Sequence, residues 1–385
     1  MHPSIKPFRV DVPEATLVDL QARLQSARLP AYEPVGEPWR YGTALDYMHG
    51  VLRYWRDEYD WRAWEKRLNR FKHFRTSLGS GDVHFIVEEG SGTAPTPLLL
   101  THGWPGSFVE FLDIIEPLAH PERFGGRVED AFTVVVPSLP GYGFSDPPPA
   151  PITPRDVAAL WRTLMVEKLG FDRYVAQGGD WGATVTSWLA LDHPAELAAI
   201  HLNMVSFRPW TGAGAAPLDD DEKRWLEAAQ KRRDGETAYQ QIQGTKPQTL
   251  AYALTDSPVG LAAWILEKFH GWTIPKQNAA PPFDPGHLLT NIMLYWINGI
   301  NAANWLYCAT VNGTSSFLQP GEKVAVPTGV LLFPDDLSVP PPNAWIKRVY
   351  YLVHRSDALT GGHFGALQCG AAFVADVRLF FRAYR

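Results

Sequence analysis

The sequence predicts an α/β fold in which a mostly parallel sheet carries helices on both faces. Three observations lead to this prediction. From residue 83 onwards, short β-branched and apolar runs alternate with helical stretches. A long segment without such runs follows residue 203, and strand-like runs resume at residue 330. The first 75 or so residues show helical patterns and no convincing strand. Strands and helices in alternation form parallel sheets that helices cover on both sides.

Seven strands and three helices are expected in the alternating part of the chain. The strands are Val83–Val87, Leu98–Leu100, Phe132–Val136, Tyr174–Ala176, Ile200–Leu202, Val330–Phe333 and Val349–Val353. The helices are Pro154–Leu169, Ala183–Leu191 and a C-terminal helix after His363. Helices between successive strands are the crossovers that parallel neighbours require.

Two further regions are expected to be helical. Near the N-terminus, apolar side chains recur every three or four residues, which places them on one helix face. They are Tyr41, Leu45, Met48, Leu52 and Trp55, preceded by Leu17, Leu20 and Leu24. The long interruption has helical stretches at Asp219–Arg233 and Leu261–Phe269 and indicates an inserted cap. We therefore expect an N-terminal helical segment (1–76), a core in two parts (77–208 and 322–385) and a helical cap (209–321).

Composition narrows the class of protein. The 385 residues include 35 basic and 41 acidic ones, and a net charge of −6 gives no reason to expect nucleic acid or an anionic membrane as partner. Cys308 and Cys369 are too few for a disulfide framework and lack metal-ligand spacing. Charges and prolines near the N-terminus argue against a secretion signal, and no run approaches the roughly 18 apolar residues of a spanning helix. We expect a cytoplasmic protein.

Residues 174–184 have the pattern of a strand, a tight glycine turn and a helix. Gly178, Asp180 and Gly182 form a small-x-nucleophile-x-small elbow with Asp at the nucleophile position. The glycines permit a strained turn that lifts the central side chain above the edge of the sheet. Asp180 could instead cap the following helix, and the pattern alone leaves both interpretations open.

Residues 98–107 follow a strand and precede a helix, where an oxyanion loop is expected. The backbone N–H groups of Trp104 and of Trp181, the residue after the elbow, could stabilise developing negative charge. We expect His102 in this loop to be a buried structural histidine.

A histidine and an acid complete the pattern in the order nucleophile, acid, histidine. His363 follows two glycines after the last expected strand, so it can reach over the strand ends. Asp335 and Asp336 follow the strand at 330–333, and a carboxylate there would orient the imidazole and stabilise its protonated form.

With these motifs, the sequence resembles the microsomal-type epoxide hydrolases of the α/β-hydrolase fold and their bacterial relatives. The resemblance covers nearly the whole chain. Its matching stretches are residues 5–8, 17–30, 102–107, 179–182, 254–268, 288–296 and 361–364. It implies an α/β-hydrolase fold with an inserted cap and a reaction that needs neither cofactor nor metal.

The resemblance also implies a role for each candidate residue. Asp180 would be the nucleophile, His363 the base and Asp336 the acid, with Asp335 as the alternative acid; the microsomal enzyme has Glu at that position. Two cap tyrosines that hydrogen-bond the epoxide oxygen in the family map onto Tyr239 and Tyr307. The Ser and Arg neighbours usual around the second tyrosine are missing here.

These residue types suit epoxide opening. A carboxylate is ionised at neutral pH and can attack a saturated carbon directly, while phenols can protonate the basic alkoxide that leaves. A base is needed only to activate the water that hydrolyses the resulting ester, which gives a vicinal diol. A small-molecule epoxide is therefore the expected substrate. Some bacterial relatives act on aryl epoxides in the biosynthesis of antibiotics such as the enediynes, so resemblance makes an aryl epoxide a candidate.

Two other classes of function compete with this interpretation. A haloalkane dehalogenase would use the same Asp, His and acid, and Trp181 could bind the halide. A halide needs no proton, however, so the tyrosine pair favours an epoxide. A non-catalytic binding protein of this fold would be expected to have lost a member of the triad, and a serine hydrolase would need a Gly-x-Ser-x-Gly motif that the sequence lacks.

Overall fold

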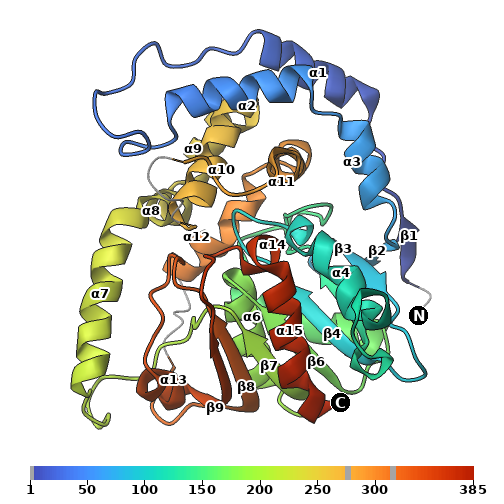
Figure 1. Cartoon of the computed structure of the whole chain (residues 1–385), viewed down its shortest axis with the longest axis vertical. Helices are drawn as coiled ribbons and strands as arrows, with labels where there is room; N and C mark the ends of the chain where they lie inside the picture. Colours follow the sequence, from blue (N-terminus) through green and yellow to red (C-terminus); the bar gives the residue numbers. More distant parts are fainter. Residues whose placement is uncertain (1–3, 274–278, 313–317) are drawn as a thin grey trace.

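The computed structural model describes residues 4–273, 279–312 and 318–385, and it places one twisted sheet at the centre of the molecule (Figure 1). Within the described residues, nine strands are joined in the order β1-β2-β3-β5-β4-β6-β7-β8-β9. They are β1 (Lys6–Phe8), β2 (His73–Ser77), β3 (Asp82–Glu88), β4 (Thr96–Thr101), β5 (Phe132–Pro137), β6 (Tyr174–Gly178), β7 (Leu197–Leu202), β8 (Val324–Leu332) and β9 (Tyr350–Asp357). The expected α/β-hydrolase architecture is confirmed.

In sheet order, the strands β5, β4, β6, β7, β8 and β9 run parallel to one another. The strands β1, β2 and β3 pair antiparallel at the edge next to β5. The central strands β5, β6 and β7 are buried along their whole length. Helices on both faces explain why their sequences are mostly apolar and do not alternate between polar and apolar residues.

Helices cover both faces of the sheet. On the face toward the viewer in Figure 1, α4 (Leu112–Ala119) packs against α15 (Gly370–Phe381), which follows the short α14 (Gly365–Gln368). On the other face, α5 (Pro154–Arg162) packs against α6 (Trp181–Asp192). A π-helical turn, Thr163–Lys168, extends α5, so the expected helix at 154–169 is present in two forms. The helix α13 (Asn343–Val349) connects β8 to β9 and packs against β9.

The expected cap consists of helices. They are α7 (Asp220–Glu236), α8 (Ala238–Thr245), α9 (Pro247–Asp256), α10 (Pro258–Gly271), α11 (Pro285–Asn298) and α12 (Trp305–Asn312). Most of them stand above the C-terminal ends of the parallel strands, whereas the first, α7, runs down beside the sheet toward α13 (Figure 1). Residues 274–278 and 313–317 of this expected cap lie outside the described residues. The cap therefore closes over the edge of the sheet where the candidate residues are expected.

The N-terminal segment differs from the expectation in two ways. Its helices α1 (Glu14–Gln25) and α2 (Leu45–Asp57) pass over the cap, and α3 (Trp61–Leu68) descends at the side toward β1 and β2 (Figure 1). These two strands join the sheet, so the segment is not wholly helical. Both are edge-side strands of three and five residues, too short for a period to be visible. Tyr41 does not belong to the helical stripe, because α2 begins at Leu45 and Tyr41 is 66% exposed.

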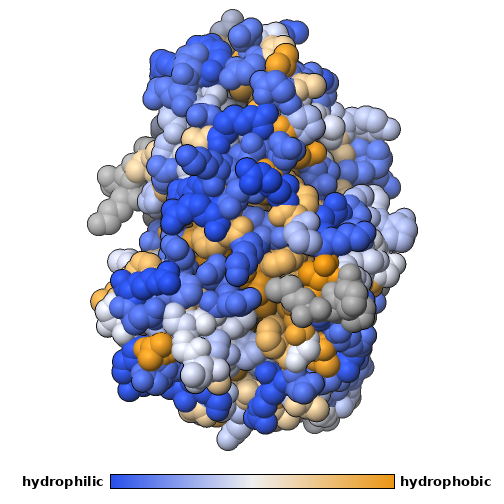
Figure 2. Space-filling view, turned by 90° about the vertical axis from the view of Figure 1, so that its right-hand side faces the viewer, coloured by the Kyte–Doolittle hydropathy of each residue, from blue (hydrophilic) through white to orange (hydrophobic). Residues whose placement is uncertain are grey.

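The face on the right of Figure 1 is mostly hydrophilic, and apolar residues show on it in separate groups (Figure 2). Within the described part of the chain, no helix combines the length and the apolar character needed to cross a bilayer.

Candidate active site

The elbow between β6 and α6 holds Asp180 in a strained conformation. Its φ of 50° and ψ of −125° lie in a region that side chains other than glycine rarely adopt. Its side chain makes no capping hydrogen bond to α6. The helix-cap interpretation of this residue is therefore wrong, and the carboxylate projects from the turn as expected of an elbow.

The two flanking glycines are required by close packing. A Cβ on Gly178 would lie 2.1 Å from the carbonyl oxygen of Gly182, and a Cβ on Gly182 would lie 1.9 Å from that of Thr101. A side chain at Gly178 would push α6 away from β6, and one at Gly182 would push α6 away from the end of β4. The sequence pattern thus reflects the backbone contacts that set the position of Asp180.

The loop after β4 brings one backbone donor to the carboxylate. The N–H of Trp104 donates to Oδ1 of Asp180 at 2.8 Å. Trp181 is the first residue of α6, where a backbone N–H has no acceptor within its own helix. The structure therefore brings the Trp104 N–H to the carboxylate of Asp180 and places Trp181 directly after Asp180, at the start of α6.

His363 lies between two carboxylates. Its Nδ1 is 2.7 Å from Oδ1 of Asp336, and its Nε2 is 3.4 Å from Oδ2 of Asp180. Asp336 is only 5% exposed. Asp335 is less buried, and its backbone N–H donates to the carbonyl of Gly361. Of the two candidate acids, the structure thus brings Asp336 to the imidazole.

The two carboxylates control the protonation of this histidine. Burial alone lowers the pKa of His363, but the charges and hydrogen bonds of Asp336 and Asp180 outweigh it and raise the pKa to about 10. The imidazole is therefore protonated at neutral pH. Its backbone N–H donates to the carbonyl of Trp272 at the end of α10, which ties the histidine loop to the cap.

The two cap tyrosines face the elbow from α8 and α12. Tyr239 and Tyr307 are buried, and their ring centroids are 5.7 Å apart. The ring of Tyr239 stacks on Trp104 at 4.8 Å, and Tyr307 packs edge-on against Trp181 at 4.7 Å. Burial, and the charge of Asp180 with it, raises the pKa of each phenol, so both keep their protons throughout the neutral range.

A cavity of about 420 Å³ joins these residues and is called the substrate cavity below. Asp180, Trp181, Tyr239 and Tyr307 line it together with residues from the loop after β7, from α7 and from the loop after β8. Its volume lies within the range of small-molecule sites.

A second, much smaller cavity contains a residue that the sequence analysis missed. Glu110, Asp180 and His363 line about 10 Å³ of accessible space, close to what one water molecule needs. Burial in the first place, with Asp180 adding to it and His363 opposing it, raises the pKa of Glu110 to about 8. The only signal in the sequence was a carboxylate six residues after Trp104, at a helix start.

His102 is structural, as expected. It is buried, its Nε2 accepts the backbone N–H of Leu139 at 3.2 Å, and its Nδ1 lies 3.1 Å from the carbonyl oxygen of Gly103. Burial lowers its pKa to about 4, so it is neutral and braces the oxyanion loop.

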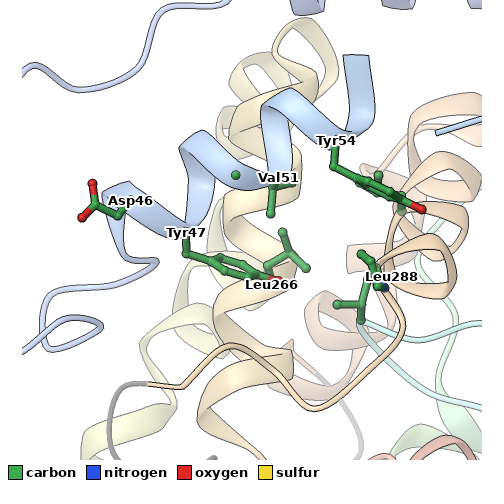
Figure 3. Close-up of a pocket in the computed structure, with 9 residues that line it drawn as sticks. Asp46, Tyr47, Val51, Tyr54, Leu266 and Leu288 are labelled. Atoms are coloured by element: carbon green, nitrogen blue, oxygen red, sulfur yellow. The ribbon is translucent and has the colours of Figure 1, made fainter. Parts of the chain in front are cut away.

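A third cavity, of about 400 Å³, lies between α2, α10 and α11 and is called the α2 cavity below. Its walls include Tyr47, Val51 and Tyr54 of α2, with Leu266 and Leu288 facing them (Figure 3). No residue of the candidate active site lines it.

Comparison with known proteins agrees with this geometry. Residues 5–111 match the family described as the epoxide hydrolase N terminus, and residues 96–307 match the α/β-hydrolase fold. The chain is 42% identical over 383 residues to a Stigmatella aurantiaca protein named as an epoxide hydrolase, covering 99% of this chain and 86% of that one. It is 35% identical to epoxide hydrolase 1 of Sus scrofa, covering 98% and 88%.

A solved structure extends the agreement. The epoxide hydrolase of Aspergillus niger superposes with a TM-score of 0.85 at 32% identity, covering 99% of this chain and 97% of that one. These relatives give no support to the haloalkane dehalogenase alternative. The chain belongs to the epoxide hydrolase family of the α/β-hydrolase fold, in the microsomal-type group that its motifs resemble.

Proposed function

We propose that Asp180, His363, Asp336, Tyr239 and Tyr307, with the backbone N–H groups of Trp104 and Trp181, are the catalytic machinery of this epoxide hydrolase. One observation carries the proposal. The carboxylate of Asp180 lies between a backbone donor and His363 and opens into the same cavity as two buried, protonated phenols. This arrangement supports one role for each group in epoxide hydrolysis.

The first step is attack of Asp180 on an epoxide carbon. Oδ1 is held by the N–H of Trp104, so Oδ2 is the oxygen that bonds to carbon. The carbon–oxygen bond of the ring breaks, and its electron pair goes to the epoxide oxygen. Tyr239 and Tyr307 donate hydrogen bonds to that oxygen, and one of them transfers its proton.

Formation of the ester changes His363 into a base. Asp180 loses its charge when it is alkylated, so it no longer raises the pKa of the imidazole, and only Asp336 still does so. The pKa therefore falls, and His363 gives up a proton that returns to the tyrosinate or to solvent. The neutral imidazole then forms at the stage where a water molecule must be deprotonated.

The second step is hydrolysis of the ester. Water, deprotonated by His363, adds to Cγ of Asp180. The bond between Cγ and Oδ2 then breaks, and the departing alkoxide takes the proton of the newly formed carboxyl group, which gives a vicinal diol and restores the charge of Asp180. The negative charge that develops on Oδ1 meets the N–H of Trp104 and, we propose, that of Trp181. Asp336 keeps the imidazole oriented and stabilises its protonated form.

The family acts on small-molecule epoxides, and an aryl epoxide is the candidate that we propose for this chain. Tyr239, Tyr307, Trp181 and Trp225 line the substrate cavity and provide aromatic walls. A role in antibiotic biosynthesis stays a prediction from resemblance.

The two steps can be separated by His363→Gln. This variant should form the ester with styrene oxide and fail to hydrolyse it, because the base acts only in the second step. Intact-mass measurement after excess styrene oxide should show one substrate mass per chain, and peptide mapping should locate it on the segment containing Asp180.

The matched control is Asp180→Asn in the same background, which should carry no adduct on that segment. The control also separates the ester from chance alkylation of Cys308 or Cys369, which are free thiols. A His363→Gln protein without an adduct, when the wild type turns over the same epoxide, would show that water attacks the epoxide directly.

A further inference from the structure

The two cap tyrosines have different neighbours, although both line the substrate cavity. The ring of Tyr307 packs against the uncharged rings of Trp104, Trp181 and Tyr239. The ring of Tyr239 has a cation beside it as well, because Nζ of Lys268 lies 4.9 Å from its centroid. Either phenol could give up its proton when the epoxide opens, and the position of this cation distinguishes them.

Lys268 is held in place by the cap. It belongs to α10, and its side chain is only 8% exposed. Its Nζ is 2.5 Å from Oε2 of Glu267 and 5.9 Å from the ring of Trp272, four residues further along the chain. Burial raises the pKa of the half-buried Glu236, and the charge of Lys268 lowers it. Glu267 is 29% exposed, so water weakens its field more than that of the buried ammonium, which is held against the face of Tyr239.

The hydroxyl oxygen of Tyr239 also has a donor of its own. It accepts a hydrogen bond from the side-chain amide of Gln240, whose Nε2 is 2.9 Å away. Burial first, and the charge of Asp180 second, raise the pKa of both phenols' nearer member, Tyr239, whereas its hydrogen bonds lower it. The hydrogen bond between the two phenols lowers the pKa of Tyr239 and raises that of Tyr307. The hydrogen bonds around these oxygens thus favour the loss of a proton from Tyr239.

The chemistry of the first step explains why these neighbours matter. A phenol that transfers its proton becomes a phenolate, whose negative charge spreads from the oxygen into the ring. A cation over the ring and an N–H donor at the oxygen both stabilise that charge. The charge of Asp180 opposes a phenolate, but it is lost as the carboxylate bonds to carbon. Proton transfer from Tyr239 therefore becomes easier as the attack proceeds.

We propose that Tyr239 is the phenol that protonates the epoxide oxygen and that Lys268 is a positioning residue that stabilises the tyrosinate. Gln240 supports the same charge at the oxygen, and Tyr307 donates a hydrogen bond without losing its proton. The O–H bond of Tyr239 breaks, the proton bonds to the epoxide oxygen, and the phenol oxygen keeps the electron pair until His363 or solvent returns a proton. The proposal rests on the catalytic assignment above, because it takes the epoxide oxygen to lie between the two phenols.

The test isolates the first step by placing every variant in the His363→Gln background. The ester on Asp180 accumulates there, so the growth of the adduct mass with time gives the rate of ester formation at each concentration of styrene oxide. Lys268→Met should lower the limiting rate about tenfold, the size expected of a cation against a buried ring, and should change the half-saturating concentration little. Lys268→Arg keeps the charge and should restore most of the rate.

The dependence on Tyr239 separates this role from a structural one. In Tyr239→Phe no tyrosinate forms at this position, so adding Lys268→Met should change the rate by less than about twofold. In Tyr307→Phe the same change should still lower it about tenfold. Gln240→Met should follow the same pattern, and it carries the comparison if Lys268→Met does not fold. Lys231→Met removes one charge from an exposed position of α7 and should have no effect in either background.

Each outcome has a definite meaning. If Lys268→Met has no effect, or slows ester formation equally with and without Tyr239→Phe, Lys268 does not act through Tyr239 and the proposal is wrong. If Tyr307→Phe is slower than Tyr239→Phe, and the effect of Lys268→Met disappears in Tyr307→Phe, the proton comes from Tyr307. Those results would leave the proposed function intact, because the ester would still form on Asp180. A complete absence of ester in His363→Gln alone would instead contradict the covalent mechanism.

Discussion

The substrate cavity and the α2 cavity are nearly equal in volume, about 420 and 400 Å³, yet they differ in what lines them. The first contains a strained carboxylate and two buried phenols, together with two guanidinium groups. The second is walled mainly by leucine, valine and tyrosine side chains, with Asp46 as its one acidic residue among the described ones. Volume alone therefore does not identify the functional site, whereas converging polar groups with shifted pKa values do.

The difference follows from where each cavity lies in the fold. The substrate cavity lies at the carboxyl ends of parallel strands, where loops from separate strands meet under the cap. The α2 cavity lies between α2, α10 and α11, whose apolar side chains leave a space where they face one another (Figure 3). Changes in the first should alter turnover, and changes in the second should alter stability alone.

The largest expected effect comes from removing both phenols of the substrate cavity. The double variant Tyr239→Phe with Tyr307→Phe should lose at least about 10⁴-fold in the rate of ester formation, and each single variant roughly 10²- to 10⁴-fold. Single-turnover measurements with styrene oxide would show this rate directly. Tyr59→Phe is the matched control, because it removes a buried hydroxyl that contacts Thr290 outside the substrate cavity. If the double variant still formed the ester at the wild-type rate, the two phenols would not distinguish the substrate cavity from the α2 cavity in function.

A smaller effect is expected from the acid that orients His363. Asp336→Asn should slow ester hydrolysis by up to about 10⁴-fold, since the imidazolium loses its charged partner. Asp335→Asn should change the rate little, because Asp335 contacts the histidine loop through its backbone N–H, which donates to the carbonyl of Gly361 and is kept in the variant. Pre-steady-state measurement of ester decay separates the two. The opposite ranking would assign the role to Asp335.

The sequence was sufficient for the central sheet and for the position of the elbow that holds Asp180. Buried parallel strands are continuous apolar runs, and the elbow needs glycines at fixed positions, so both leave local patterns. The edge strands β1 and β2 left none, because they are short and mix polar with apolar residues. Tyr41 fits the helical spacing but precedes the start of α2, which a pattern of spacings alone cannot locate.

The remaining parts of the site depend on burial. Asp335 and Asp336 are adjacent and chemically identical, and only the path of the loop after β8 decides which one meets His363. Glu110 belongs to a single 3₁₀ turn, Phe108–Phe111, and its raised pKa results from the small cavity that it shares with the nucleophile. Neither property is encoded in a local pattern.

Glu110 gives a prediction about stability rather than rate. Its pKa is about 8 in the folded protein and near 4.5 in the unfolded chain. Between these values the folded protein holds a proton that the unfolded chain has released, so stability falls as pH rises from about 4.5 to about 8 and changes no further above that. Glu110→Gln has no such proton.

Urea unfolding at several pH values would test this. The free energy of unfolding of Glu110→Gln relative to the wild type should increase by a few kcal/mol between about pH 4.5 and pH 8 and then level off. A difference that is constant with pH would mean that Glu110 has the same pKa in the folded and unfolded protein, so that the small cavity does not hold its carboxyl group protonated.

The smallest effect is expected at Gly50, which lines the α2 cavity. This glycine lies inside α2 with an ordinary φ, and a Cβ at this position would meet nothing within 4 Å. Gly50→Ala should therefore raise the free energy of unfolding by about 0.4 to 1 kcal/mol, because alanine favours the helix and restricts the unfolded chain. The value of kcat/KM should not change, since the α2 cavity holds no group used in the reaction.

The control is Gly235→Ala on α7, where a Cβ also meets nothing within 4 Å. It should raise the free energy of unfolding as well. If Gly50→Ala lowers kcat/KM several-fold and Gly235→Ala does not, the α2 cavity takes part in function, and the distinction drawn between the two cavities is wrong.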